Sequence, residues 1–236
     1  MKKLSLLLLA LMLLALSACA EPPRQRERTQ VRVLLAGSLV VPFDELERAF
    51  EARNPDVDVL MEGHGSIQCV RHVSELGELA DVVAVADYSL IPLLMYTTKV
   101  PETGRPYAEW TMQFATNQLG LAYTSQSAYA DEITADNWYE ILNTPDVKYV
   151  ISDPNTDPAG YRAVMSIQLA ERVYGVDTIF SSLLGAHSKM TRTFADGKYT
   201  IDVTKPTPDG KLVIGKSGPD VVTILKEGKA DYAIEY

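Results

Sequence analysis

The chain has 236 residues, of which 47% are hydrophobic and 22% are charged, with 14 Gly and 13 Pro. These proportions exclude a collagen-like, coiled-coil or disordered chain, and the length suffices for one large domain or two small ones. The formal net charge of −9 argues against a general nucleic-acid binder, because phosphate contacts need a basic surface. It does not exclude a small anion, whose binding depends on local hydrogen-bond donors.

The N-terminus has the pattern of an export signal. Lys2 and Lys3 precede an almost unbroken apolar run that is too short to span a membrane comfortably. The run ends in Leu-Ser-Ala-Cys, which resembles the lipobox of a bacterial or archaeal lipoprotein: residues 1–18 would be removed and Cys19 lipidated. The alternative is a secretory signal with a chance cysteine. We expect residues 19–30 to be the lipidated Cys and a tether. The protein would then be exported and lipid-anchored to the outer face of a membrane, at the cell surface or in the periplasm.

Strand and helix patterns alternate directly after the tether. Continuous or alternating apolar residues indicate strands, and apolar residues at helical spacing indicate helices. The expected elements are a strand at 31–35, a helix at 43–50, a strand at 57–61, a helix at 67–76 and a strand at 81–86. This βαβαβ order predicts an α/β architecture with a parallel sheet covered on both faces.

A second run of elements follows, again on apolar patterning and turn signals. We expect a strand at 119–124, a helix at 138–142 capped by Asp136, a strand at 147–151, a long helix ending at Gly175, a hairpin within 190–213, a helix at 221–225 opened by Pro219, and a strand at 230–236. The chain therefore predicts two α/β units.

Four turns place glycine or a small polar residue where a helix begins: Gly37-Ser38, Gly65-Ser66, Asp157-Pro158 and Ser217-Gly218-Pro219. Taken singly, each is better explained as a structural cap. Together they carry more weight, because helix N-termini bind anions and lie at the carboxyl ends of strands in open α/β sheets. The pattern predicts an exported two-lobed binder of an anion.

Longer motifs resemble the WtpA family of tungstate/molybdate-binding lipoproteins of ABC importers. In order along the chain they are 36–39, 62–66, 75–77, 80–84, 86–92, 114–118, 137–138, 153–162 and 231–233. The resemblance implies a type II periplasmic-binding-protein fold, with lobe one at 31–113 and lobe two at 114–236. It implies a monomer without cofactor or catalysis, which captures tungstate or molybdate and delivers it to a membrane permease and its ATPase.

The resemblance also implies the ligand-binding residues, which are Gly37, Ser38, Ser66, Asp157, Ala159 and Tyr236. The family places carboxylates directly on the metal centre, and Asp157 is the first candidate for this role. A carboxylate would repel sulfate or phosphate unless one partner were protonated, whereas a high-valent metal favours oxygen ligands. The alternative for Asp157 is a cap of the helix that begins at Pro158.

The second carboxylate of the family pattern is missing, because Gly218 stands at the aligned position. Glu235 could supply this metal ligand instead, and Asp220 is a weaker option. Side chains alternate along a regular strand, so Glu235 and Tyr236 would point to opposite faces. The alternative for Glu235 is a solvated charge at a strand end.

The WtpA family continues past the point that corresponds to Tyr236, with a segment that completes lobe one. We therefore expect lobe one to be incomplete, with exposed strand edges and apolar surface. The alternatives are a fragment, a truncated gene or a remainder encoded separately. In function, the rivals are a binder of sulfate or phosphate and a truncated surface lipoprotein that binds nothing.

Other chemistries fit less well. Residues 210–217 match the phosphate-loop pattern G-x-x-x-x-G-K-S, but the apolar residues lie inside the match, where a strand fits better. A G-x-S-x-G hydrolase motif is absent from the sequence. His64, His72 and His187 show no metal-ligand spacing. Cys69 is the only cysteine besides the lipidation candidate, so the mature chain has no intramolecular disulfide.

Overall fold

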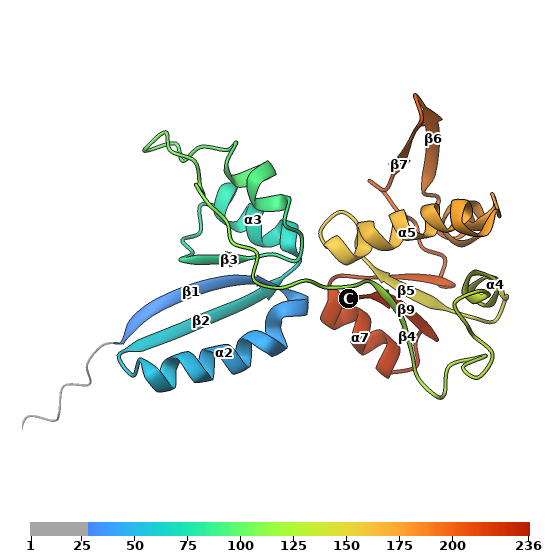
Figure 1. The fold of residues 1–236 in the computed structure, drawn as a ribbon, viewed down its shortest axis with the longest axis horizontal. Helices are drawn as coiled ribbons and strands as arrows, with labels where there is room; N and C mark the ends of the chain where they lie inside the picture. The colour runs from blue at the N-terminus through green and yellow to red at the C-terminus, as the bar shows by residue number, and fades with distance from the viewer. Residues whose placement is uncertain (1–27) are drawn as a thin grey trace, which may run out of the picture.

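The computed structural model describes residues 28–236, which form two α/β units (Figure 1). The predicted signal peptide, the Cys19 lipidation site and nearly all of the tether lie outside the described residues. Within 28–236, no helix combines the length and the apolar character needed to cross a membrane.

The first unit is a three-stranded parallel sheet in the order β2-β1-β3. The strands are β1 (Thr29–Ala36), β2 (Val57–His64) and β3 (Val82–Ala84). Its helical segments are a 3₁₀ turn (Gly37–Leu39), α2 (Val40–Arg53), α3 (Ser66–Ser74) and a π-helical turn (Ile91–Met95). Helices α2 and α3 lie on opposite faces of the sheet (Figure 1). Accordingly, Val33 and Leu35 pack on the α2 side, and Leu34 packs against Cys69 of α3.

The α2 face of the first unit is poorly covered. A cavity of about 530 Å³ lies between α2 and the strands, and its lining is almost wholly apolar. Leu46 and Phe50 line it and are about half exposed. The predicted exposed apolar surface on this unit is therefore present.

The second unit is a four-stranded sheet in the order β4-β9-β5-β8, in which β4 alone is antiparallel to its neighbour. The strands are β4 (Gly120–Tyr123), β5 (Tyr149–Ser152), β8 (Leu212–Gly215) and β9 (Tyr232–Glu235). The helical segments are α4 (Trp138–Asn143), α5 (Pro158–Tyr174), a π-helical turn (Ser181–Gly185), α6 (Ala186–Ser188) and α7 (Gly218–Lys226).

Both faces of the second sheet are covered. Tyr149 and Ile151 of β5 pack in the cluster that contains Ile167 of α5, and Val150 between them packs with Val221 of α7. This alternation on one strand places the two helices on opposite faces (Figure 1). A separate hairpin of β6 (Thr191–Ala195) and β7 (Lys198–Asp202) projects from the unit, within the range expected for it.

Most predicted elements are found, with two differences. Helix α5 ends where expected, because Gly175 takes the left-handed conformation (φ 69°) that terminates helices. The expected cap of α4 by Asp136 is wrong: Asn137 is the N-cap residue, and its side chain accepts from Thr134 N–H instead. The two π-helical turns were not predicted, because apolar spacing does not distinguish them from α-helix. Strand β8 lies inside the phosphate-loop match, which confirms the preference for a strand there.

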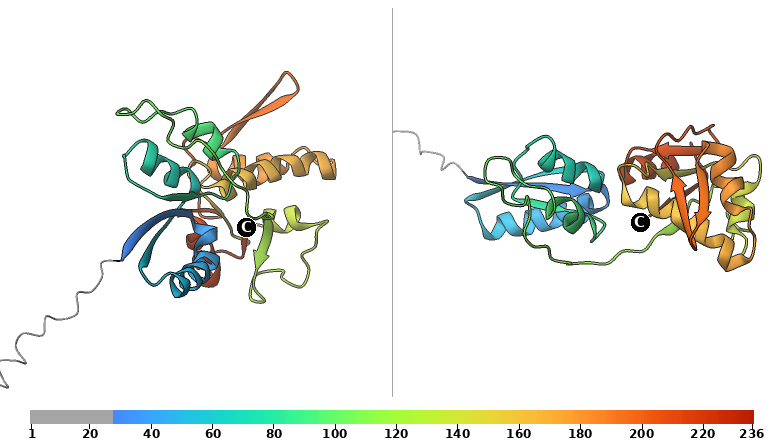
Figure 2. Two further views of the ribbon diagram at one scale, coloured as in Figure 1. Left: turned by 60° about the vertical axis from the view of Figure 1, so that its left-hand side comes forward. Right: turned by 90° about the horizontal axis from the view of Figure 1, so that it is seen from above.

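The two units meet where their helices begin. Within the described residues, the chain passes from the first unit to the second through the segment before β4, which runs along one side of the contact (Figure 2). Gly37 lies so close to Pro219 that a Cβ on it would be 2.6 Å from Pro219 Cδ. Gly65 lies still closer to Thr156, whose carbonyl oxygen also accepts from Ile67 N–H at 3.2 Å. The exact lobe boundary between residues 113 and 114 stays a prediction.

Candidate functional site

Strand register brings the four predicted helix-start turns together. Strands β1 and β2 end side by side, with Ala36 opposite His64, so the turns at Gly37 and Gly65 are neighbours. In the second unit β5 and β8 end together in the same way. The close approaches of Gly37 and Gly65 to the second unit join the two sets of turns. The carboxyl ends of the parallel strands in the two sheets thus meet, as expected for a ligand site in α/β proteins.

Asp157 lies at the N-termini of two helices. Its Oδ1 accepts from Ala159 N–H of α5 at 3.0 Å, and its Oδ2 accepts from Gly218 N–H of α7 at 3.2 Å. The predicted capping of α5 is confirmed. Burial raises the pKa of Asp157 above its ordinary value, the two N–H groups lower it, and the charge of Asp153 raises it. Each oxygen keeps a further lone pair, so capping and ligand binding are compatible.

Glu235 is a second buried carboxylate in the same place. It is 8% exposed and ends β9, so the alternative of a solvated strand-end charge is wrong. A Cβ built on Gly218 would lie 3.2 Å from Glu235 Oε1, which places this carboxylate beside the position where the family pattern has an acid. Burial, together with the charge of Asp157, raises the pKa of Glu235 to about 7 against the lowering effect of Tyr236 N–H.

Three buried polar side-chain atoms within residues 28–236 have no hydrogen-bond partner: Ser152 Oγ, Glu235 Oε2 and Tyr236 OH. All three belong to the carboxyl ends of β5 and β9. Strand β9 ends at Glu235, so the side chain of Tyr236 need not point to the opposite face from that of Glu235. Both residues interact electrostatically with Asp157. An unpartnered buried polar atom is costly and calls for an explanation. One explanation is a bound ligand that supplies the missing hydrogen-bond partners.

The first unit contributes smaller groups. Ser66 is fully buried, and its Oγ accepts from Ala86 N–H at 3.0 Å, which leaves the hydroxyl proton free to be donated. Ser38 is exposed on the 3₁₀ turn. Two candidate ligand residues of the second unit, Ala159 and Asp220, already have hydrogen-bond partners. The N–H of Ala159 donates to Asp157, and the carboxylate of Asp220 accepts from Lys216 N–H at 2.8 Å.

An ion pair across the two units was not predicted. Asp87 follows β3 in the first unit, and its Oδ2 lies 3.0 Å from Arg162 Nη2 and accepts from the Tyr161 hydroxyl, both on α5. Its Oδ1 accepts from the backbone N–H and hydroxyl of Ser89. Burial raises the pKa of Asp87, but these donors outweigh it and hold the pKa at about 2. These residues lie in the motifs at 86–92 and 153–162, yet the motifs do not say which residues pair.

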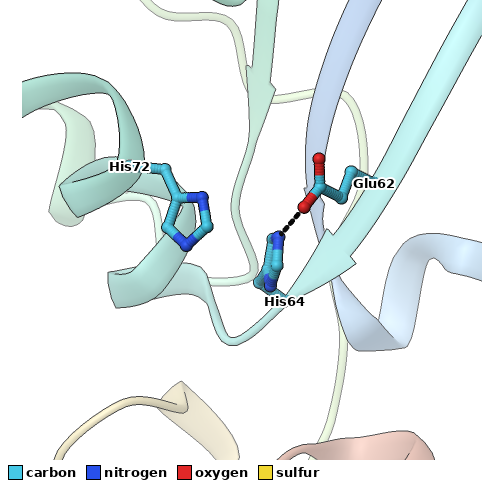
Figure 3. Close-up of side chains that lie close together, drawn as sticks. All are labelled: Glu62, His64 and His72. Atoms are coloured by element: carbon cyan, nitrogen blue, oxygen red, sulfur yellow. Dashed lines mark hydrogen bonds and ion pairs between the residues drawn. The ribbon is translucent and has the colours of Figure 1, made fainter. Parts of the chain in front are cut away.

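Two histidines come together as well, although their sequence spacing gave no metal-site signal. His64 ends β2, His72 lies on α3, and their ring centroids are 4.4 Å apart. Glu62 approaches His64 Nε2 at 2.8 Å (Figure 3). One ligand atom from each of the three residues lies within 4.8 Å of the others. The sequence spacing gave no sign of this pair, whose rings meet only in the folded chain.

The cavity beside β4 is separate from all these residues. It has a volume of about 480 Å³ and is lined mainly by apolar side chains, including Leu119, Trp138 and Ile234. No candidate ligand residue lines it, so it has no part in the site at the unit boundary.

A family model described as bacterial extracellular solute-binding protein matches residues 31–236. The chain is 46% identical over 211 residues to an uncharacterized solute-binding protein of Methanoculleus marisnigri, covering 89% of this chain and 57% of that protein. It is 37% identical over 242 residues to the molybdate/tungstate-binding protein WtpA of Pyrococcus abyssi, covering 99% of this chain and 67% of that one. The chain thus spans about three fifths to two thirds of these relatives.

Solved structures share the fold. The sulfate-binding protein SubI of Mycobacterium tuberculosis superposes with a TM-score of 0.60 at 14% identity, covering 89% of this chain and 65% of that one. The periplasmic molybdate-binding protein of Azotobacter vinelandii gives a TM-score of 0.57 at 14% identity, covering 87% and 70%. At such low identity the likeness concerns the fold alone. It confirms the predicted α/β periplasmic-binding-protein fold.

Proposed function

We propose that this chain, which belongs to the bacterial extracellular solute-binding protein family, captures tungstate or molybdate and delivers it to an ABC-type permease and its ATPase. The family consists of binding proteins rather than enzymes, in agreement with the prediction of no catalysis. Its extracellular character agrees with export. The lipid anchor on Cys19 and the monomeric state belong to the proposal.

The pair of buried carboxylates carries this proposal. Asp157 and Glu235 are 7% and 8% exposed, their charges interact, and Glu235 Oε2 lacks a partner. Two such groups oppose the binding of an ordinary dianion, because like charges repel strongly where water is excluded. They suit an oxyanion whose hard, high-valent centre accepts carboxylate oxygens as additional ligands. Tungstate and molybdate are oxyanions of this kind.

Hydroxyl groups would hold the oxyanion's own oxygens. Ser66 has a hydroxyl proton to donate, and Tyr236 OH and Ser152 Oγ lack partners within the described residues. Gly37 and Ser38 would add contacts from the first unit. Sulfate is a smaller tetrahedron, so donors placed for tungstate would be left unmet by it, at about 1–3 kcal/mol for each buried group.

Because the pKa of Glu235 is about 7, the number of protons released or taken up on ligand binding distinguishes two binding modes. If Glu235 binds the metal centre as a carboxylate, tungstate binding at pH 6 should release close to one proton, and almost none at pH 8.5. If the protonated acid instead donates to an oxyanion oxygen, binding should take up a proton at pH 8.5. The second mode also suits sulfate or phosphate, which is the specific reason to keep such a binder as the second candidate. Titration calorimetry in buffers of different ionisation enthalpy counts these protons.

Titration of the full chain in detergent with tungstate, molybdate and sulfate tests the proposal. We expect Glu235→Gln and Asp157→Asn to lower the tungstate affinity about 100-fold, equivalent to about 2.7 kcal/mol. Asn caps helices as well as Asp, so Asp157→Asn separates the charge from the cap. Asp220→Asn is the matched control near the same helix terminus and should bind as the parent does.

Three results would overturn the assignment. Sulfate binding as tight as tungstate binding would favour the second candidate. Unchanged tungstate affinity in both carboxylate variants would remove these residues from the site. No binding by a folded parent chain would favour a surface lipoprotein that binds nothing.

A further inference from the structure

We propose that Glu62, His64 and His72 form a binding site for a divalent transition-metal ion, for which Zn²⁺ is the probe. The site lies within the first unit and does not depend on the oxyanion proposal. Figure 3 shows the three side chains converging between the end of β2 and α3. A set of two imidazoles and one carboxylate suits zinc, copper or nickel better than magnesium or calcium, which prefer oxygen ligands alone.

The backbone fixes two of the three ligands on one face. Glu62 and His64 are two residues apart on β2, so their side chains leave the strand on the same side. The ladder to β1 pairs Glu62 with Leu34 and His64 with Ala36, which fixes this register. His64 Nε2 and Glu62 Oε1 are 2.8 Å apart. This is a hydrogen-bond separation, and the two atoms would have to move slightly apart to share one tetrahedral metal ion.

The third ligand is brought over by the turn at Gly65. Helix α3 starts directly after this turn, and its second turn carries His72 to the His64 ring, with an angle of 40° between the two ring planes. Zinc bonds of about 2.0–2.2 Å place neighbouring ligand atoms about 3.3 Å apart in a tetrahedral site. The three ligand atoms lie within 4.8 Å of one another, so side-chain rotation must close the remaining gap.

Exposure and a supporting carboxylate favour metal entry. The side chain of Glu62 is 52% exposed and those of the two histidines are each 23% exposed, which leaves a path from solvent and room for a water as fourth ligand. Glu78 Oε2 lies 3.2 Å from His72 Nδ1, which leaves Nε2 of that ring for the metal. A carboxylate on the other nitrogen is the usual support of a metal-bound histidine, because it orients the ring and raises its basicity.

The chain contains its own control. His187 Nδ1 pairs with Asp209 at 2.8 Å, with a side-chain exposure close to that of the other two histidines. Within residues 28–236, however, no second histidine or cysteine joins this pair in a metal-sized group. It therefore reproduces the histidine–carboxylate contact without the converging third ligand. A general affinity of histidine for zinc would affect this pair as much as the proposed site.

The test uses the full chain without a histidine tag, titrated with Zn²⁺ in competition with a chromophoric chelator. We expect one bound equivalent in the parent, a loss of at least about 100-fold in affinity for His64→Gln and for His72→Gln, and no change for His187→Gln. Cobalt substitution in the parent should give the visible absorption of a tetrahedral site.

A parent chain that binds no Zn²⁺ would overturn the proposal, as would a His72→Gln variant that binds like the parent. A loss of binding caused only by His187→Gln would do the same. If a variant fails to fold, the parent alone decides. Paramagnetic Cu²⁺ should broaden the ring-proton NMR signals of two of its histidines and spare the third, and equal broadening of all three would contradict the site.

Discussion

The carboxylate of Glu235 lies beside the α-carbon of Gly218, so that a side chain at position 218 would begin 3.2 Å from Glu235 Oε1. The two positions therefore compete for one location at the start of α7. This relationship supports the hypothesis that Glu235 supplies the carboxylate that the family pattern has at the position of Gly218.

Moving the acid between the two positions tests that hypothesis. Glu235→Ala alone should weaken tungstate binding about 100-fold. Adding Gly218→Glu to it should restore most of the affinity, because the new carboxylate would start from the adjacent backbone position. Gly218 has no left-handed conformation, so a side chain there is not strained by the backbone. Calorimetric titration measures both variants, and a double variant as weak as the single one would show that the two positions are not equivalent.

Burial of Glu235 should make stability fall as the pH rises. The pKa of this group is about 7 in the folded chain, against an ordinary value of 4.5. Between these values the folded state holds a proton that the unfolded state has released, so stability declines from pH 4.5 to 7 and then levels off. The full effect at pH 8 is about 3 kcal/mol.

The matched comparison for this pH effect is Glu235→Gln, in which the position stays polar but uncharged. Urea unfolding of parent and variant at a series of pH values should show the variant gaining relative stability above pH 5. If the unfolding free energies of parent and variant changed with pH in the same way, ionisation of Glu235 would not destabilise the folded chain. Protonation of Asp87, whose pKa is about 2, changes the stability only below pH 4, outside the range in which Glu235 titrates.

The Asp87–Arg162 pair should act on ligand release. Asp87→Asn removes the charge that joins the two units, and we expect tungstate to dissociate about ten-fold faster, since hydrogen bonds to charged groups contribute about 1.5–3 kcal/mol. Glu109→Gln is the control: its pair with Arg105 is exposed and lies within one unit, so it should have no effect. Stopped-flow measurement of tungstate release distinguishes the variants. Identical release rates for Asp87→Asn and the parent would rule out this role.

Gly65→Ala should separate the two units. Its Cβ would lie 2.4 Å from the carbonyl oxygen of Thr156, a distance that real Cβ atoms do not reach, so the backbone must move. We expect weaker tungstate binding and a larger radius of gyration in small-angle scattering. Gly120→Ala is the control, because nothing lies within 4 Å of its Cβ and its conformation is ordinary. A Gly65→Ala chain as compact and as tight-binding as the parent would contradict the close contact.

Features that depend on residues close together in the sequence could be predicted from the sequence. The alternation of strands and helices, the end of α5 at Gly175 and the capping by Asp157 follow from apolar period and from residues with restricted roles. Contacts between distant segments could not be found this way. Asp87 meets Arg162 only because two separate sheets bring their carboxyl ends together. His64 and His72 meet only because a strand and a helix fold back at Gly65, and no ligand spacing records such a return.

The contacts of Asp87 with Tyr161 and Arg162 join the two units without any ligand between them. Part of the free energy that holds the units together therefore comes from the protein itself. If the proposed oxyanion enters between the units, those contacts have to break first, and the association rate should then level off at high anion concentration, at the rate of opening. Such a protein would exchange its ligand on the timescale of its own opening rather than that of diffusion.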